Sequence, residues 1–327
     1  MKAIRVVGEG REARLVLGEA PAPETGPDEV RIKVAATAVN RADLLQKRGL
    51  YPPPPGAPEI LGLECAGVID QVGGNVAGLA PGDRVMALLA GGGYAEQVSV
   101  HAGSVMPVPR GVSFEAAAAI PEVFLTAYLN LFEIGGARAG GWVLVHGGSG
   151  GVGTAAIQIL KAEGIRVIVT CGSDDRCRRC LDLGADAAIN YREGPFAPRV
   201  IEATGGEGAD VILDVVGAPY LDQNIRSLRT GGRLVLIGLM GGRKSEIDLA
   251  PLLMRRLHLS GSTLRSRSPE EKAGIARRFM DCFGDRLSRG EIRPIVDRVL
   301  SLDQAEEAHA LIERGEPFGK VVLKVSP

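Results

Sequence analysis

The chain has 327 residues, 45% of them hydrophobic and 24% charged, with a formal net charge of −1 at pH 7. This length exceeds what one hydrophobic core usually supports, so two domains are expected. The near-neutral charge gives no electrostatic basis for binding nucleic acid or an anionic membrane. We expect no signal peptide and no apolar run of about 18 residues, hence no membrane association and a cytoplasmic location. The five cysteines are expected to be reduced.

The first 110 residues are predicted to be rich in β-strands. Apolar residues alternate there in short segments separated by glycine, proline and aspartate turns, which is typical of half-buried, mostly antiparallel strands. The segments are IRVV, EVRIKVAA, AGVIDQVG, DRVMALL and AEQVSV. The prolines of YPPPPGAP, at 51–58, are expected to stiffen a loop able to line a site.

From Pro121 the pattern changes to apolar strand cores that alternate with helical stretches. WVLVH, RVIVT, VILDVV and RLVLIG are the strand cores, and their alternation with helices predicts a doubly wound parallel sheet. After Ser268 come two helical segments and a last strand, GKVVLKV. The predicted fold class is therefore α/β: a discontinuous β-rich domain, residues 1–120 and 269–327, into which a Rossmann domain, residues 121–268, is inserted.

A glycine-rich turn follows the strand core Trp142 to His146. Gly148, Gly150 and Gly153 satisfy G-x-G-x-x-G, and a helical pattern begins at once. Glycines permit a tight turn and a close backbone approach, so that a pyrophosphate can lie against N–H groups at the helix N-terminus. In a strand–turn–helix context, this motif predicts a dinucleotide site.

The residues after the second strand core bear on the choice of dinucleotide. Enzymes that use NAD place an acidic residue there, against the ribose 2′-hydroxyl. This chain has Gly172 and Ser173, with Arg176 nearby, which leave room for a 2′-phosphate and supply donors for it. NADPH is therefore favoured. Asp174 and Asp175 argue for NADH unless they are solvated residues of the helix start.

Neither a metal cluster nor an activated nucleophile is evident. Cys177 and Cys180 form the only close cysteine pair, without a second pair at ligand spacing, and the four histidines are scattered. No serine or cysteine lies in a recognisable nucleophile motif. A bound cofactor must then carry the chemistry, which favours acceptors that take hydride easily.

Several segments in order resemble the medium-chain dehydrogenase/reductase superfamily. They are VAATAVNRADLLQKRGLYPPPPGAPEILGLECAGVI, GDRVMALLAGGGYAEQVSV, AAAIPEVFLTAY, HGGSGGVGTAAIQ, the NY at 190–191, LIGLMGG and LRSR. The similarity is to its zinc-independent quinone oxidoreductase branch, and looks closest to the quinone oxidoreductases induced by a tumour suppressor. Asn40 to Asp43 stand where the zinc enzymes carry a cysteine ligand, and Gly62, Leu63 and Glu64 where they have Gly-His-Glu. The resemblance implies a GroES-like β-rich domain, NADPH, no metal, and a homodimer for which 257–264 is a plausible edge.

The resemblance also implies a set of cofactor contacts on both sides of the dinucleotide. They are Asn40, Thr126, Ser149, Gly150, Gly151, Val152, Gly153, Gly172, Ser173, Arg176, Tyr191, Gly238, Leu239, Met240, Leu264, Arg265, Ser266 and Lys320. Asn40 and Tyr51 are the candidate catalytic residues. The family places the segment of Tyr51 beside the nicotinamide, where its phenol is able to bind a quinone oxygen or supply a proton. The alternatives are a capping role for Asn40, packing on the prolines for Tyr51, and a solvated charge for Arg265 or Arg267.

These observations predict an NADPH-dependent reductase that transfers hydride to a small-molecule quinone. An alternative is an enoyl reductase, because the same chemistry suits an α,β-unsaturated carbonyl (enone) substrate. A second alternative is a protein that binds NADPH as a structural or regulatory module with little turnover.

Overall fold

The structure is a computed structural model and describes residues 1–325. The chain forms two compact units: unit 1 comprises Met1–Leu125 and the chain from Leu264 onward, and unit 2 comprises Thr126–Thr263. Unit 2 therefore begins five residues later and ends five residues earlier than the Rossmann domain predicted from the sequence. Two contacts explain the difference: Phe124 packs on Phe279 at a centroid distance of 6.1 Å, and Arg265 Nε donates to the Ala90 carbonyl at 2.9 Å.

Unit 1 is built on a seven-stranded sheet, in which β6 pairs with β3 off the main path. All neighbours are antiparallel except β14 and β15, which are parallel. Along β3, the buried residues Val30, Ile32 and Val34 alternate with more exposed ones, as expected for a half-buried strand. In sheet order the strands are β14 (Val296–Ser301), β15 (Lys320–Lys324), β3 (Glu29–Ala38), β4 (Glu64–Val72), β5 (Arg84–Leu88) and β7 (Val105–Pro107), with β6 (Gln97–His101) beside β3.

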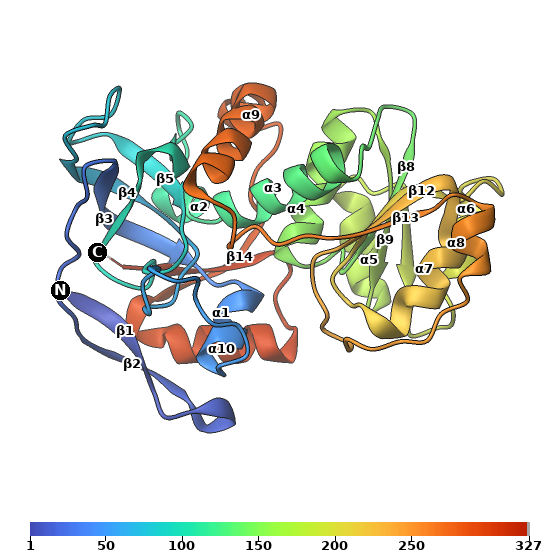
Figure 1. Cartoon of the computed structure of the whole chain (residues 1–327), viewed down its shortest axis with the longest axis horizontal. Helices are drawn as coiled ribbons and strands as arrows, with labels where there is room; N and C mark the ends of the chain where they lie inside the picture. Colours follow the sequence, from blue (N-terminus) through green and yellow to red (C-terminus); the bar gives the residue numbers. More distant parts are fainter. Residues whose placement is uncertain (326–327) are drawn as a thin grey trace. The chain divides into compact units, whose positions relative to one another are not determined.

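A separate hairpin and several helices complete unit 1. Strands β1 (Lys2–Val7) and β2 (Arg14–Glu19) form the hairpin. In Figure 1, α1 (Arg41–Lys47) and α10 (Ala305–Arg314) lie side by side, and Lys47 Nζ contacts Glu306 Oε1 at 2.7 Å between them. The remaining helices are α2 (Phe114–Ala117), α9 (Pro269–Ser288), and α3 (Pro121–Tyr128), which begins in unit 1.

Unit 2 confirms the predicted doubly wound sheet. Six strands, all parallel, lie in the order β10-β9-β8-β11-β12-β13, and Figure 1 shows helices around this sheet. The strands are β8 (Trp142–His146), β9 (Arg166–Cys171), β10 (Ala187–Asn190), β11 (Ala209–Asp214), β12 (Leu228–Leu236) and β13 (His258–Gly261). The helices are α4 (Gly151–Ala162), α5 (Asp174–Asp182), α6 (Ala197–Ala203), α7 (Leu221–Ser227) and α8 (Ala250–Met254). Because the strands are parallel, their carboxyl ends meet at one edge, where ligands of this architecture bind.

One segment corrects the expectation that no apolar run is long enough to span a membrane. Phe114–Ile134 has 21 residues and a mean hydropathy of 1.3, which satisfies the length and composition of a span. Within this segment, 72% of the 18-residue window is buried inside the molecule. Burial of this extent is also what a core helix of a folded protein shows, so the segment is weak evidence for a membrane span.

Candidate functional site

The glycine turn at the carboxyl end of β8 is tightly built. A Cβ on Gly148 would lie 2.5 Å from Val169 Cβ, and one on Gly153 would lie 2.3 Å from the Gly147 carbonyl oxygen. Gly150 is the N-cap of α4, and a Cβ there would meet nothing closer than 3.4 Å. Two of the motif glycines are therefore required by packing, whereas Gly150 leaves the helix N-terminus open to an anion.

The residues predicted to select the 2′-phosphate come together in unit 2. Arg176 Nη1 donates to Ser149 Oγ at 2.9 Å, and the backbone N–H of Arg176 donates to Ser173 Oγ at 3.4 Å. Gly172 faces Tyr191, since a Cβ on this glycine would lie 2.7 Å from the phenol oxygen. Tyr191 itself is 42% exposed. The cluster thus places a guanidinium, two hydroxyls and a phenol at the ends of β8, β9 and β10.

Asp174 and Asp175, which argued against a 2′-phosphate, are both exposed in the first turn of α5. Asp174 Oδ1 accepts a hydrogen bond from Asn190 Nδ2 at 2.9 Å, and Asp175 lies 3.9 Å from Arg178. Acidic residues in a first helical turn are stabilised by the helix dipole. The start of α5 therefore explains why Asp174 and Asp175 occur here, and neither residue requires a contact with the ribose.

The turn after β12 is attached to the end of β11. The backbone N–H of Met240 donates to the Val215 carbonyl at 3.1 Å, and a Cβ on Gly238 would lie 2.9 Å from the same oxygen. Leu239 and Met240 are 53% and 58% exposed, so two apolar side chains of this turn are available for contact. Gly151, Val152 and Thr126, also predicted to touch the cofactor, are half-buried in unit 2.

In unit 1, Asn40 belongs to a buried polar cluster with Glu64 and Lys320. Lys320 Nζ donates to Glu64 Oε1 at 2.8 Å, to Asn40 Oδ1 at 2.6 Å and to the Val39 carbonyl at 2.9 Å. Asn40 Nδ2 also donates to Glu64 Oε1, at 2.8 Å. Lys320 is 3% exposed and uses its three N–H groups within the protein. The geometry therefore favours a role in holding Asn40 and Glu64 over the direct cofactor contact expected of Lys320.

Asp43 is buried next to this cluster and is bonded to the backbone of Asn40. Its carboxylate accepts hydrogen bonds from the backbone N–H of Asn40 at 2.8 Å and of Gly62 at 3.0 Å. Burial raises the pKa of Asp43 to about 6, against the lowering effect of these two hydrogen bonds. The Tyr94 hydroxyl lies 3.4 Å from Asp43 and 3.1 Å from His309 Nε2. Because all these groups are buried, they fix the segment from which Asn40 projects.

A second polar group in unit 1 surrounds Tyr51. The Arg265 guanidinium lies 5.3 Å from the centroid of the Tyr51 ring, a cation–π distance. Arg265 is 4% exposed: its Nη2 donates to Gln46 Oε1 at 2.7 Å, while Nη1 is buried with no hydrogen-bond partner. The interpretation of Arg265 as a solvated charge is therefore wrong. Of its predicted neighbours, Leu264 is buried and Ser266 is exposed.

Glu122 belongs to the same region and was not singled out from the sequence. Its backbone N–H donates to Glu64 Oε2 at 2.9 Å, and its side chain is half-buried. Burial, and next the negative charge of Glu64, raise the pKa of Glu122 to about 8, while Lys320 and Lys272 oppose the shift. Nothing in the local sequence marks this residue, because its environment comes from strands and helices distant in the chain.

Cys171, Cys180 and His146 take structural positions in unit 2. Cys171 and Cys180 Sγ are 3.5 Å apart and buried, and this contact, followed by burial, raises the pKa of the Cys171 thiol. His146 is held between Thr170 and Asn224, at 2.9 and 2.7 Å. Within residues 1–325, no group of three or more histidine, cysteine or acidic side chains is arranged to hold a metal ion.

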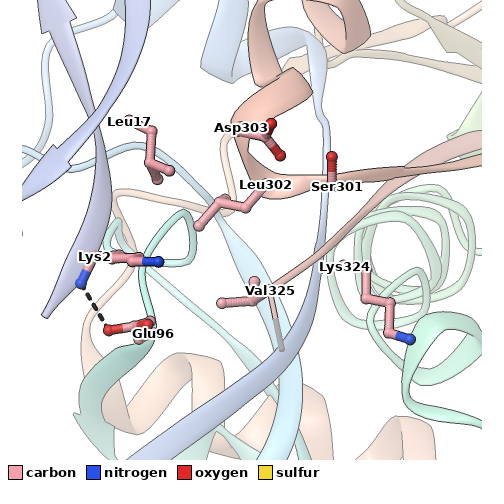
Figure 2. Close-up of a pocket in the computed structure, with 8 residues that line it drawn as sticks. All are labelled: Lys2, Leu17, Glu96, Ser301, Leu302, Asp303, Lys324 and Val325. Atoms are coloured by element: carbon pink, nitrogen blue, oxygen red, sulfur yellow. Dashed lines mark hydrogen bonds between the residues drawn. The ribbon is translucent and has the colours of Figure 1, made fainter. Parts of the chain in front are cut away.

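Two pockets, one in each unit, lie away from these residues. One pocket has a volume of about 280 Å³ and lies in unit 1. Figure 2 shows Leu17, Leu302 and Val325 in its lining, with the charged side chains Lys2 and Asp303. Another, of about 430 Å³, is lined by residues of α7, α8 and the chain next to α8 in unit 2. Neither contains a residue predicted for the site, so neither informs the chemistry.

Comparison with known proteins identifies the class. Residues 26–110 match the family model described as alcohol dehydrogenase GroES-like domain, and residues 151–280 match that described as zinc-binding dehydrogenase. The GroES-like unit with a Rossmann unit inserted into it defines a medium-chain dehydrogenase/reductase.

The full-length relatives narrow this class. The quinone oxidoreductase of Rattus norvegicus is 32% identical over 99% of this chain and 97% of its own length. A mycobacterial protein solved in complex with NADPH has a TM-score of 0.88 and 32% identity, covering 99% of this chain and all of the other. A structure described as an NAD-dependent alcohol dehydrogenase has a TM-score of 0.86 and 36% identity, with full coverage of both chains. The chain belongs to the quinone oxidoreductase family.

Proposed function

We propose that this protein is an NADPH-dependent oxidoreductase that reduces a quinone or similarly activated carbonyl compound without a catalytic zinc ion. The observation that carries the proposal is the cluster of Ser149, Gly172, Ser173, Arg176 and Tyr191 at the carboxyl edge of the unit 2 sheet. When bound, NADPH supplies a hydride from nicotinamide C4. The protein then has to bind the dinucleotide, bind the acceptor and provide for a proton.

The choice of NADPH over NADH depends on the residues at the end of β9. Arg176 and the two serines offer a cation and hydroxyl groups, which suit a phosphate dianion, and Gly172 allows the Tyr191 phenol to lie against the end of β9. Asp174 and Asp175, which would repel a 2′-phosphate, contact Asn190 and Arg178 instead, in the first turn of α5. The NADPH complex of the mycobacterial relative agrees with this choice, whereas the description of the NAD-dependent relative does not.

The proposal of a zinc-independent mechanism is supported by the cluster around Lys320. Glu64, at the position where the sequence resemblance places part of a zinc ligand motif, is engaged by the Lys320 ammonium and by the amide of Asn40. A cation bound to this carboxylate would have to displace both donors. The three members of this cluster, Asn40, Glu64 and Lys320, include neither cysteine nor histidine, the ligands that zinc prefers.

Acceptor binding is assigned to Tyr51 and Arg265 in unit 1. Within residues 1–325, the Tyr51 hydroxyl has no hydrogen-bond partner, and Arg265 Nη1 has none either. Burial, and next the charge of Glu122, raise the pKa of Tyr51, so its phenol stays protonated and able to donate at neutral pH. Two free donors of this kind suit a carbonyl oxygen that gains negative charge during reduction.

The experiment that tests this proposal compares acceptors with purified protein and NADPH. A simple benzoquinone and crotonyl-CoA would be offered separately, with the products identified by mass spectrometry. The proposal expects hydroquinone to form faster than butyryl-CoA. Faster reduction of crotonyl-CoA would instead favour an enoyl reductase. NADPH binding without turnover of either acceptor would favour a structural or regulatory role. The homodimer and the cytoplasmic location remain predictions.

A further inference from the structure

The polar group around Tyr51 contains a carboxyl group whose function the hydride chemistry leaves open. Glu122 lies in the first turn of α3, and the hydrogen bond from its backbone N–H to Glu64 Oε2, at 2.9 Å, fixes it beside the Lys320 cluster. Its side-chain carboxyl has no hydrogen-bond partner among residues 1–325 and is only half-buried. A carboxyl without a protein partner has both oxygens available to a ligand that enters this part of unit 1.

The surroundings of Glu122 come from several elements and carry both signs of charge. Tyr51 and Arg265 interact electrostatically with it and with each other, and Arg265, a residue that is 4% exposed, has Nη1 buried without a hydrogen-bond partner. An unpaired buried donor is costly, and its persistence marks a place where a ligand oxygen is expected. The charged and titratable groups that act on Glu122 are Glu64 from β4, Asp43 from α1, Lys320 from β15, Lys272 from α9, and Tyr51 and Arg265 from loops.

We propose that Glu122 is the proton donor of this enzyme, and that Arg265 Nη1 binds the acceptor oxygen that becomes negatively charged. This inference deepens the proposed function and rests on it. The acceptor takes a hydride, with its electron pair, from NADPH. The O–H bond of the Glu122 carboxyl then breaks, a new O–H bond forms on the reduced quinone, and the carboxylate regains a proton from water. The sum is NADPH, quinone and one proton giving NADP⁺ and hydroquinone.

The protonation state of Glu122 agrees with this assignment. With a pKa raised to about 8, first by burial and then by the charge of Glu64, most of the carboxyl holds its proton at pH 7. Tyr51 is less suited to give up a proton, because its own pKa is raised. We therefore assign Tyr51 to hydrogen bonding and Glu122 to proton donation, which departs from the role first expected of Tyr51.

The test is the pH dependence of the single-turnover rate of quinone reduction. Because the protonated form is active, the wild-type rate is expected to be constant below about pH 7 and to fall tenfold per pH unit above about pH 8. Glu122→Gln is expected to lower the rate on the order of 10²-fold at pH 7 and to abolish this decline. The matched control is Glu115→Gln, the same change in the first turn of α2, which is expected to keep the wild-type rate and profile.

A second measurement is independent of turnover. Infrared difference spectroscopy of the resting protein is expected to show a protonated carboxyl band that titrates near pH 8 and is missing from Glu122→Gln. An unchanged pH profile in a Glu122→Gln protein that reduces quinones would overturn the inference while leaving the proposed function intact. If wild type and both variants bind NADPH but reduce no acceptor, the proposed function is wrong. If the infrared band is missing from the wild-type protein, Glu122 is not protonated, and the inference is wrong whether or not the protein reduces quinones.

Discussion

Lys320 and Glu64 form an ion pair of 2.8 Å in which the lysine side chain is 3% exposed and the glutamate is fully buried. The pair joins β15 to the start of β4, and both partners also bond to Asn40. A buried ion pair adds little net stability relative to apolar residues, but removing one partner leaves an uncompensated charge. The pair therefore makes the position of Asn40 depend on a lysine 280 residues further along the chain.

Lys320→Met is expected to lower the free energy of unfolding by about 3–5 kcal/mol, because Glu64 would remain buried and unpaired. Urea denaturation followed by circular dichroism measures the change. The control is Arg48→Met, which breaks an exposed pair with Glu313 in the same unit and is expected to cost less than about 1 kcal/mol. Equal losses for the two variants would contradict the role given to the buried pair.

Arg176→Ala is expected to weaken NADPH binding about 10- to 100-fold, because one charge-assisted hydrogen bond contributes about 1.5–3 kcal/mol. NADH binding is expected to change little, because the guanidinium is assigned to the 2′-phosphate. Fluorescence titration gives both dissociation constants. Arg178→Ala, on the same helix but with a side chain 70% exposed, serves as the control. A parallel loss of affinity for both dinucleotides would refute the assignment.

Two of the three motif glycines, Gly150 and Gly153, are expected to respond differently to replacement by alanine. In Gly153→Ala the new Cβ would lie 2.3 Å from a backbone oxygen, so the protein should unfold at a clearly lower temperature even without cofactor. In Gly150→Ala the Cβ meets nothing closer than 3.4 Å, so the melting temperature should hold while NADPH affinity falls. Differential scanning fluorimetry with and without NADPH distinguishes these effects. Normal NADPH affinity in a stable Gly150→Ala protein would place the pyrophosphate elsewhere.

Strand β13 is expected to join two copies of the chain. It is the last strand in the sheet order and pairs, among residues 1–325, with β12 alone, and Leu259 on it is 37% exposed. An exposed edge of this kind favours pairing with another strand. Light scattering is expected to give about twice the 34.3 kDa chain mass for wild type and the single mass for Leu259→Lys. A wild-type monomer would exclude this arrangement.

Much of the fold follows from local sequence patterns. Strands with strong apolar alternation, such as β3, and buried apolar strands, such as β8 and β9, were predicted. The strands β10 and β14 were not, because β10 has only four residues, two of them alanine, and β14 has no buried residue. Their pairing comes from neighbours in the sheet, which a local pattern does not contain.

The candidate site, too, was predictable from the sequence only in part. That Ser173 and Arg176 lie together was predictable, because both follow one strand and are close in the chain; their role at a 2′-phosphate stays a prediction. The contacts of Lys320 were not, because its partners lie on β4 and before α1. Glu122 looks like any acidic residue at a helix start, and only the burial and charges supplied by the folded unit distinguish it.

The central claim is NADPH-dependent quinone reduction without zinc. The most direct measurement follows the loss of NADPH absorbance when purified protein, treated with a strong zinc chelator, is mixed with NADPH and a panel of quinones. We predict turnover well above the uncatalysed rate, undiminished by the chelator and faster with NADPH than with NADH. A rate equal to the uncatalysed reaction, or one that the chelator abolishes and added zinc restores, would contradict the account.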